Sequence, residues 1–268
     1  MKLKKVLALV LSAALVVSAF AGCGGKSSSS TTSTESIAAS ESSAESTEST
    51  ASGDSTPAAS GDATAIFTPK TVDAAKTISL NAGMEPTGLN TLTSTYAIEF
   101  SLFKHMYENL VTLDDDDNTV PGAAESWDYD EDTLTYTFHL RQDVTWHDGE
   151  KFTAEDVKFT IEAIQDPKNE SENASNYEDV EKITVVDDHT VKFQLSAPNY
   201  AFLDYMTMAI LPKHLLEGKD LQTDDYFRHP IGTGPYKLAS WEAGQAITLE
   251  RNESYFRGKA NIQTIIFR

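Results

Sequence analysis

The chain has 268 residues and is strongly acidic: 41 Asp and Glu residues outnumber 21 Lys and Arg residues, which gives a formal net charge of −20. Such a chain repels nucleic-acid phosphates and anionic lipid surfaces, so we do not expect it to bind either through its charge. Its single cysteine, Cys23, excludes an internal disulfide, and any folded domain must therefore rely on core packing.

The start of the chain has the pattern of a secretory signal. Three lysines among the first five residues precede an apolar run from Val6 to Phe20, and small residues then lead to Cys23. The run is shorter than the roughly 20 apolar residues that a membrane-spanning helix needs. We therefore expect residues 1–22 to be a signal peptide.

The sequence Phe20-Ala21-Gly22-Cys23 resembles a bacterial lipobox. The resemblance implies that the thiol of Cys23 is diacylated and that Cys23 becomes the new N-terminus. The protein would then be anchored by lipid to the outer face of the cell membrane, within the periplasmic space if the host is Gram-negative. The alternative is an unmodified thiol that lies within a signal peptide.

Residues 23–75 have a composition that does not build a core. As far as about Pro69 they are almost all Ser, Thr, Ala, Gly and Glu, and Phe67 is the first aromatic residue among them. Such a segment buries too little apolar area to offset its chain entropy. We interpret it as a flexible linker; a phosphorylated or glycosylated tail is the alternative.

The remaining body, from about Lys76 to Arg268, is long enough for a substantial core. Residues Thr77 to Leu80 predict a short strand, followed by a loop that contains Gly83 and Gly88. A helix is predicted from about Tyr96 to Leu110, with an apolar flank that includes Phe103 and Met106.

The acidic run from Asp114 to Asp117 suggests a metal site at first sight. A calcium loop, however, alternates ligands with spacers and needs a glycine and a distal bidentate Glu, which Asn118, Thr119 and Val120 do not supply. A solvated hairpin turn is the favoured interpretation, and no metal site is predicted.

A β-hairpin and a helix are predicted between Pro121 and Ile164. Apolar and polar residues alternate over residues 134–140, and Trp127 and Tyr129 give the preceding strand the same alternation. The turn at residues 147–149 includes Gly149, which is free to adopt a positive φ. Thr153 is expected to cap the following helix with Asp156 in capping-box spacing, and its core face is formed by Val157, Ile161 and Ile164.

The second half of the body predicts further strands and short helices. Two strands are expected at Ile183–Val186 and Val191–Leu195, and short helices are expected at Pro198–Met208 and Pro212–Leu216. A hairpin follows, and the last strand closes the sequence; their residues are Tyr236–Trp241 with Ile247–Glu250, and Ile262–Phe267.

The segment from Ile231 to Tyr236 carries two glycines around Thr233. Glycines permit close backbone approach, which is useful for binding a ligand through main-chain groups. No Walker-type lysine follows Gly234, so the segment is not a phosphate loop. Thr233, Gly234 and Tyr236 are therefore candidate ligand-binding residues.

No catalytic arrangement emerges from the sequence. It contains neither a Gly-x-Ser-x-Gly elbow nor a His-Glu-x-x-His motif, and its 6 histidines lack metal-ligand spacing. We therefore expect a protein that is not an enzyme and that needs no cofactor.

The run PGAAESWDYDEDTLTYTFHLRQDVTWHDGEKFTAEDVKFTIEAI, with IGTGPY and RNESYFRG further on, resembles the peptide/nickel/opine family of extracellular solute-binding proteins. These are the ligand-capturing subunits of ABC importers, and the resemblance covers about Lys76 to Arg268. It implies the α/β first lobe of a two-lobed, periplasmic-binding-protein-like clamp, with a mixed, hairpin-rich sheet flanked by helices. It further implies a sheet-based part, from about Lys76 to Tyr107 and from about Glu181 onwards, with an inserted subdomain at about 108–180. The chain stops about where the family crosses to its second lobe, so we expect a truncated N-terminal lobe.

The resemblance also supplies candidate ligand contacts. In the family, the loop after the first strand reaches the ligand cleft, which points to Thr95 and Tyr96; the alternative is that both are ordinary helix-start residues. The segment ending at Tyr177 aligns with one whose tyrosine stacks along a bound peptide, although Tyr177 would otherwise simply pin a loop. The residues that hold the peptide termini are expected in the second lobe.

The function that the resemblance implies is the capture of oligopeptides outside the membrane. The partners would be the permease and ATPase subunits of an ABC importer, and the receptor itself would be a monomer. Two alternatives stay open. The same fold could bind a nickel chelate, an opine or a sugar, or the chain could be a signalling or chaperone-like lipoprotein without a role in transport.

Overall fold

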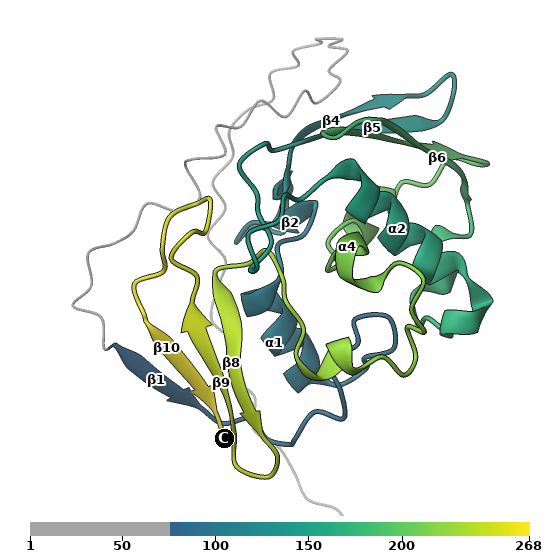
Figure 1. Cartoon of the computed structure of the whole chain (residues 1–268). Helices are drawn as coiled ribbons and strands as arrows, with labels where there is room; N and C mark the ends of the chain where they lie inside the picture. The colour runs from purple at the N-terminus through teal and green to yellow at the C-terminus, as the bar shows by residue number, and fades with distance from the viewer. Residues whose placement is uncertain (1–75) are drawn as a thin grey trace, which may run out of the picture. The chain divides into compact units, whose positions relative to one another are not determined.

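The computed structural model describes residues 76–268 of the chain (Figure 1). The predicted signal peptide, Cys23 and the linker lie outside these residues. The described part contains two four-stranded sheets and a two-stranded sheet, together with short helices. Within it, none of the helices has the length and apolar character needed to cross a membrane.

The first sheet joins the beginning and the end of the described chain. Its strand order is β1-β10-β9-β8, and β1 runs parallel to β10 while the other pairs are antiparallel. Its strands are β1 (Thr77–Leu80), β8 (Tyr236–Glu242), β9 (Ala246–Arg251) and β10 (Thr264–Phe267). The predicted first strand and the predicted hairpin are confirmed, and the last strand begins two residues later than expected. Ile247, Leu249 and Ile265 form the buried face of this sheet.

Helix α1 (Ala97–Met106) packs against β8, as Figure 1 shows. It ends four residues before the predicted Leu110, because Tyr107 already has an extended backbone. The carbonyl of Met106 accepts a hydrogen bond of 2.9 Å from the amide of Gly234. This distant amide satisfies one of the carbonyls that a helix leaves without an intrahelical partner at its C-terminus.

A small hairpin follows, formed by β2 (Val111–Leu113) and β3 (Thr119–Pro121). The carboxylate of Asp114 accepts hydrogen bonds from the backbone amides of Asp116 and Asn118, both at 2.9 Å. The acidic run is therefore the hairpin turn that the sequence predicts. No group of three or more metal-ligating side chains occurs within residues 76–268.

The second four-stranded sheet is entirely antiparallel, with the order β4-β5-β7-β6. Its strands are β4 (Ala124–Asp130), β5 (Thr135–Leu140), β6 (Val180–Asp187) and β7 (Thr190–Leu195). The strands β6 and β7 belong to the sheet of β5, where Tyr136 pairs with Phe193, whereas the expected division placed the chain from about Glu181 with the first sheet; the division itself stays a prediction. Leu134, expected within a strand, lies in the turn before β5 with φ of 51°.

Helix α2 (Ala154–Gln165) packs against β6 and β7. Its predicted cap is confirmed: the backbone amide of Thr153 donates to Asp156 Oδ2 at 2.9 Å. The helix ends before Pro167, as expected. The remaining helical turns are η2 (Pro167–Asn169), η3 (Ala174–Tyr177), α3 (Phe202–Tyr205), α4 (Lys213–Leu216) and η4 (Asp225–Arg228).

The helix predicted over residues 198–208 is reduced to the single turn α3. Beyond it, the amides of Met206 and Thr207 donate to carbonyls only three residues back, those of Leu203 and Asp204. This tight pattern is that of a 3₁₀-type turn, which does not propagate. The predicted helix at residues 212–216 is confirmed as α4, preceded by Pro212.

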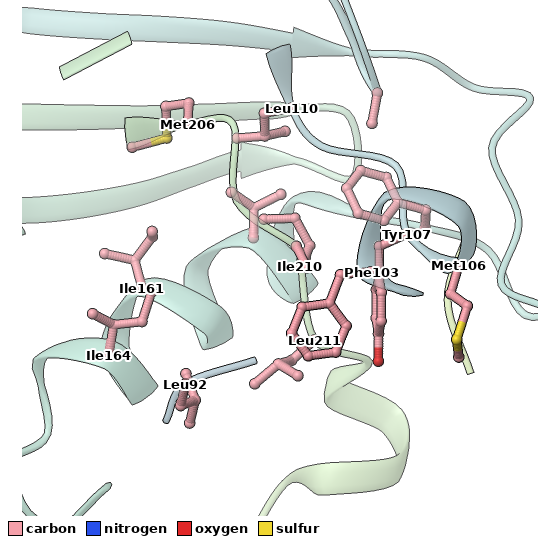
Figure 2. Packing of buried hydrophobic residues seen from close by; sticks show 14 of the residues in the cluster. Leu92, Phe103, Met106, Tyr107, Leu110, Ile161, Ile164, Met206, Ile210 and Leu211 are labelled. Atoms are coloured by element: carbon pink, nitrogen blue, oxygen red, sulfur yellow. The ribbon is translucent and has the colours of Figure 1, made fainter. Parts of the chain in front are cut away.

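The core links α1, α2 and the segment that precedes α4. Figure 2 shows buried side chains from these elements gathered in one place, and each of them is at most 7% exposed. Burial of each such apolar side chain contributes about 1.5–3 kcal/mol of stability. The cluster includes Leu92, Phe103, Met106, Leu110, Ile161, Ile164, Ile210 and Leu211.

Candidate ligand-binding edge

The loop between β1 and α1 is bordered by two hollows of different character. One, with a volume of about 250 Å³, lies between residues 81–86 and the turn that joins β8 to β9. The other, of about 310 Å³, lies between residues 87–94 and residues 222–228. We call the loop, the two hollows and the first turn of α1 the ligand-binding edge, because Ser94 and Glu99, which flank the predicted ligand residues Thr95 and Tyr96 in the sequence, line the second hollow.

The first hollow combines apolar walls with a carboxylate. Trp241, Ile247 and Phe267 are among the residues that line it. Glu85 accepts hydrogen bonds from the indole nitrogen of Trp241 at 3.2 Å and from the amide of Gly244 at 3.0 Å. These bonds hold the loop after β1 against the β8–β9 turn, and they leave an apolar cavity with negative charge at its rim.

The second hollow is polar and rests on a buried carboxylate. Glu99 is only 1% exposed. Its Oε1 accepts from the amide and the hydroxyl of Thr87, at 3.1 and 3.2 Å, and its Oε2 accepts from the amide of Tyr96 at 3.4 Å. One side chain therefore ties the loop to the first turn of α1. The spacing of Tyr96 and Glu99 is that of a capping box, which could have indicated this role from the sequence.

Thr95 and Tyr96 are exposed at the start of α1, where Tyr96 is the N-cap residue. The side chain of Tyr96 is 41% exposed, and that of Phe100, one turn further on, is 47% exposed. Their rings are available for stacking against a ligand. The placement is compatible with a ligand role, which stays a prediction for both Thr95 and Tyr96.

Tyr177 lies away from this edge, in the core. It is 1% exposed, its hydroxyl donates to the carbonyl of Tyr205, and it lies 2.7 Å from the sulfur of Met208. Burial raises the pKa of its hydroxyl well above the usual range. These contacts correspond to the alternative interpretation, a tyrosine that pins the η3 segment.

The glycine motif at residues 231–236 is also internal. A Cβ atom at Gly232 would overlap the carbonyl oxygen of Met106, and one at Gly234 would lie 2.6 Å from the carbonyl carbon of Met106. The close approach that these glycines permit is therefore to α1. The ligand role expected for Gly234 stays a prediction beside this structural role.

The other groups of this motif are satisfied within the protein as well. The hydroxyl of Thr233, a residue that is 2% exposed, accepts from the amide of Glu108 at 3.1 Å. The carbonyl of Gly234 accepts from His147 Nε2 at 3.1 Å and from the side-chain amide of Asn252 at 3.2 Å. Tyr236 is buried, and its hydroxyl donates to the carbonyl of Ile262 at 3.0 Å.

Sequence reasoning placed His147 only in a turn and missed its contacts with the glycine motif. The backbone amide of Gly232 donates to the Nδ1 of His147 at 3.0 Å, although the two residues are 85 positions apart in the chain. Local sequence contains no signal for a pairing at that separation. Each of the two motifs was recognised, but the contact between them is visible only in the structure.

Comparison with known proteins identifies the family. Residues 118–268 match the family model for bacterial extracellular solute-binding proteins, family 5 Middle. The oligopeptide-binding protein AppA of Bacillus subtilis is 33% identical over 190 residues, which cover 69% of this chain and 35% of AppA. The chain thus spans about a third of the length of this curated relative.

Solved structures of the same kind are similar to the described fold. NikZ of Campylobacter jejuni, in complex with Ni(L-His), is 36% identical with a TM-score of 0.66; the match covers 72% of this chain and 38% of NikZ. AppA in complex with a nonapeptide is 31% identical, with a TM-score of 0.68 and coverage of 71% and 39%. AgaA of A. tumefacien R10, in complex with agropinic acid, is 31% identical, with a TM-score of 0.66 and the same coverage.

The predicted α/β, periplasmic-binding-protein-like fold is confirmed by these structures. The family model matches residues 118–268, which are more than half of the chain, and the resemblance found in the sequence is confirmed with it. The chain belongs to the bacterial extracellular solute-binding proteins of family 5.

Proposed function

We propose that the chain is part of the substrate-binding component of an ABC importer and that it captures oligopeptides outside the cytoplasmic membrane. The similarity to AppA over 190 residues supports the general role, because AppA is an oligopeptide-binding protein. The complex of AppA with a nonapeptide supports the class of ligand.

The ligand-binding edge is the part of the structure that favours an extended ligand over a compact one. Its two hollows lie along one loop; the first has a largely apolar lining with charged groups at Glu85, Glu242 and Arg268, and the second is lined mainly by polar and charged groups. A peptide offers several side chains in sequence, so it suits two separate hollows of different chemistry. A compact metal chelate would fill only one of them.

The action of the protein would be binding without bond cleavage. A closing clamp would surround the peptide, hydrogen bonds to the peptide backbone would supply affinity, and permissive side-chain hollows would tolerate different sequences. A separate permease would form the translocation path and a separate ATPase would hydrolyse ATP. The receptor would act as a monomer and would need no cofactor.

The predicted export and anchoring complete the proposal. Cys23, after removal of residues 1–22, would carry the lipid, and residues 23–75 would let the folded lobe move above the membrane surface. Labelling of the expressing cells with radioactive palmitate tests this step. We expect incorporation into the native chain and none into Cys23→Ala, and equal incorporation into both would contradict the anchor.

Other ligands of the family are the main alternatives. NikZ, which was solved with Ni(L-His), is more similar in sequence to this chain than AppA is, at 36% identity against 31%. AgaA was solved with agropinic acid. A sugar ligand, or a signalling or chaperone-like lipoprotein, is a further alternative; a permease and an ATPase encoded beside the gene would favour import over these last two roles.

Calorimetric titration of the complete protein tests the proposed ligand. We expect saturable binding to members of a peptide library and no binding of the nickel–histidine complex or of an opine. A flat titration with peptides, together with saturable binding of the nickel complex, would replace the oligopeptide by the chelate. Failure of every solute to bind would favour the signalling or chaperone-like role.

A further inference from the structure

His147 connects two motifs that are distant in the sequence. Its backbone amide donates to the carbonyl of Gly232 at 2.9 Å. Its ring contacts the same segment twice, through Nδ1 to the amide of Gly232 at 3.0 Å and through Nε2 to the carbonyl of Gly234 at 3.1 Å. Its own carbonyl accepts from the ammonium group of Lys237 at 2.8 Å. His147 thus joins the turn to the glycine motif by three hydrogen bonds, and a fourth bond ties its carbonyl to Lys237 on β8.

The two partners of the ring determine its protonation state. An amide hydrogen points at Nδ1, so Nδ1 must be an unprotonated acceptor. A carbonyl oxygen faces Nε2, so Nε2 must carry the hydrogen. Only the neutral Nε2–H tautomer satisfies both, because a doubly protonated ring would set its Nδ1 hydrogen against the amide hydrogen of Gly232.

The glycine segment that His147 holds also fixes the C-terminal end of α1. The amide of Gly234 donates to the carbonyl of Met106, and the absence of side chains at Gly232 and Gly234 lets the backbones meet. Helix α1 has 10 residues, and the exposed Tyr96 caps its other end. Because a helix of this length is rigid, a shift of its C-terminal end also moves the end that lies in the ligand-binding edge.

We propose that His147, as the neutral Nε2–H tautomer, is the positioning residue that sets the placement of α1 through the Gly232–Gly234 segment. Tyr96 on the ligand-binding edge would thereby receive its position from a residue that does not touch the ligand. The placement of α1 by His147 is independent of the proposed function, whereas the consequence for ligand capture rests on the proposed function.

The surroundings of the ring favour the neutral form. Burial is the main cause that lowers the pKa of His147 from 6.5 to about 4, and the positive charge of Lys237 on β8 acts in the same direction. The hydrogen bond to the carbonyl of Gly234 and the charge of Asp148 raise the pKa of His147, and Asp148 is itself paired with His214 of α4 at 2.9 Å. His229, from the segment before β8, lines the same hollow as His147 and Asp148.

The sign of the pH dependence follows from these values. The folded-state pKa is lower than the unfolded-state pKa, so between pH 6.5 and 4 the unfolded chain binds a proton that the folded chain does not. The contribution to stability is therefore complete above pH 6.5 and is lost as the pH falls toward 4. At pH 5 the unfolding equilibrium constant should be about 30-fold larger from this residue alone than at pH 7.5.

Substitution by glutamine separates positioning from general packing. In His147→Gln, the amide oxygen can accept from Gly232 and the amide nitrogen can donate to Gly234, but the side chain does not titrate. We expect this variant of the full chain to keep slow amide exchange at Gly232 and Gly234. It should lose the 30-fold increase in the unfolding equilibrium constant between pH 7.5 and pH 5. In His147→Leu, which lacks both hydrogen bonds, exchange at these amides and at the end of α1 should be fast at every pH.

His139→Gln is the matched control, since His139 is paired with Asp128 on the surface, where its side chain is 40% exposed. Its pH profile, measured by denaturant unfolding, should keep the component that His147→Gln loses. Parallel profiles for the native chain and His147→Gln between pH 7.5 and 5 would overturn the proposal.

A measurement on the native chain covers the case in which a variant does not fold. Nitrogen NMR of the histidine rings at pH 7 should show His147 with a hydrogen on Nε2 and none on Nδ1. The Nδ1–H tautomer or a doubly protonated ring would also overturn the proposal.

Peptide titrations of the same variants then separate the two proposals. If peptides bind neither the native chain nor any variant while exchange follows the expected series, the proposed ligand is wrong and the positioning role stands.

Discussion

The two ends of helix α1 differ in what surrounds them. At the N-terminal end, Tyr96 and Phe100 are exposed, and the buried Glu99, which lines the polar hollow, accepts a hydrogen bond from the amide of Tyr96. At the C-terminal end, Thr233 and its flanking glycines are enclosed, and the hydrogen-bonding groups described above have partners inside the protein. Both ends contain residues that the sequence suggested as ligand contacts.

This difference indicates which end of α1 is suited to contact a ligand and which end holds the helix in place. A main-chain group that already has a partner gains little from a ligand, because binding would exchange one hydrogen bond for another. Exposed aromatic rings beside concave surface have no such competing partner, and they gain from being covered. The N-terminal end of α1 is thus the end suited to contact a ligand, and the C-terminal end is suited to hold the helix.

The largest expected effect lies at the enclosed end. In Gly232→Ala the new methyl group would overlap the carbonyl of Met106, a backbone atom that cannot move aside without displacing α1. We expect a loss of about 3 kcal/mol in the free energy of unfolding. Gly88→Ala is the matched control, because a Cβ at Gly88 meets nothing within 4 Å, and it should change the stability by less than about 0.5 kcal/mol. If the two variants were equally stable, the close backbone approach at Gly232 would not distinguish the enclosed end of α1 from the exposed end.

The next largest effect on stability is expected at Glu99, which supports the exposed end of α1. Glu99→Ala removes the acceptor for three donors, two on Thr87 and one on Tyr96, whose bonds are partly buried, and it truncates a side chain that is itself only 1% exposed. We expect destabilisation by about 2 kcal/mol, measured by denaturant unfolding, and faster amide exchange at Thr87.

The matched control for Glu99→Ala is Glu162→Ala on α2. Glu162 is exposed and contributes only a surface pair with Lys158 at 3.8 Å, so its loss should change stability by about 0.5 kcal/mol at most. An equally small effect of Glu99→Ala would mean that the exposed end of α1 has no buried support.

A third prediction concerns Tyr177, which shares the enclosed character of the glycine motif. Tyr177→Phe removes the hydroxyl and leaves the carbonyl of Tyr205 unpaired. We expect a loss of about 1 kcal/mol in the free energy of unfolding and unchanged affinity for peptides. The control Tyr200→Phe alters a side chain that is 92% exposed and should change neither quantity. A loss of affinity at unchanged stability would restore Tyr177 to the ligand wall.

Much of the fold follows from local patterns in the sequence. The cap formed by Thr153 and Asp156, the core face at Val157 and Ile161, and the alternation in β5 and β7 depend on residues close together in the chain. The resemblance to the family found in the sequence is also confirmed.

The remainder depends on contacts between distant residues. The pairing of β7 with β5 joins strands 50 residues or more apart, and neither strand carries a signal for its partner. The glycines of residues 232 and 234 could serve a ligand or a helix equally well by sequence, because both uses require only a missing Cβ. Only the structure shows the carbonyl of Met106 beside both glycines.

The smallest effect on stability is expected at the exposed end, and there affinity is the informative quantity. Tyr96→Ala removes a side chain that is 41% exposed, so the free energy of unfolding should change by no more than about 0.5 kcal/mol. If the ring stacks on the ligand, peptide affinity should fall about 10-fold, which corresponds to about 1.4 kcal/mol. Calorimetry beside Tyr200→Ala, an exposed tyrosine outside the ligand-binding edge, measures this difference. Loss of affinity in Tyr96→Ala with none in Tyr200→Ala would place recognition at the N-terminal end of α1. Unchanged affinity in both would leave the two ends of the helix alike in having only structural roles.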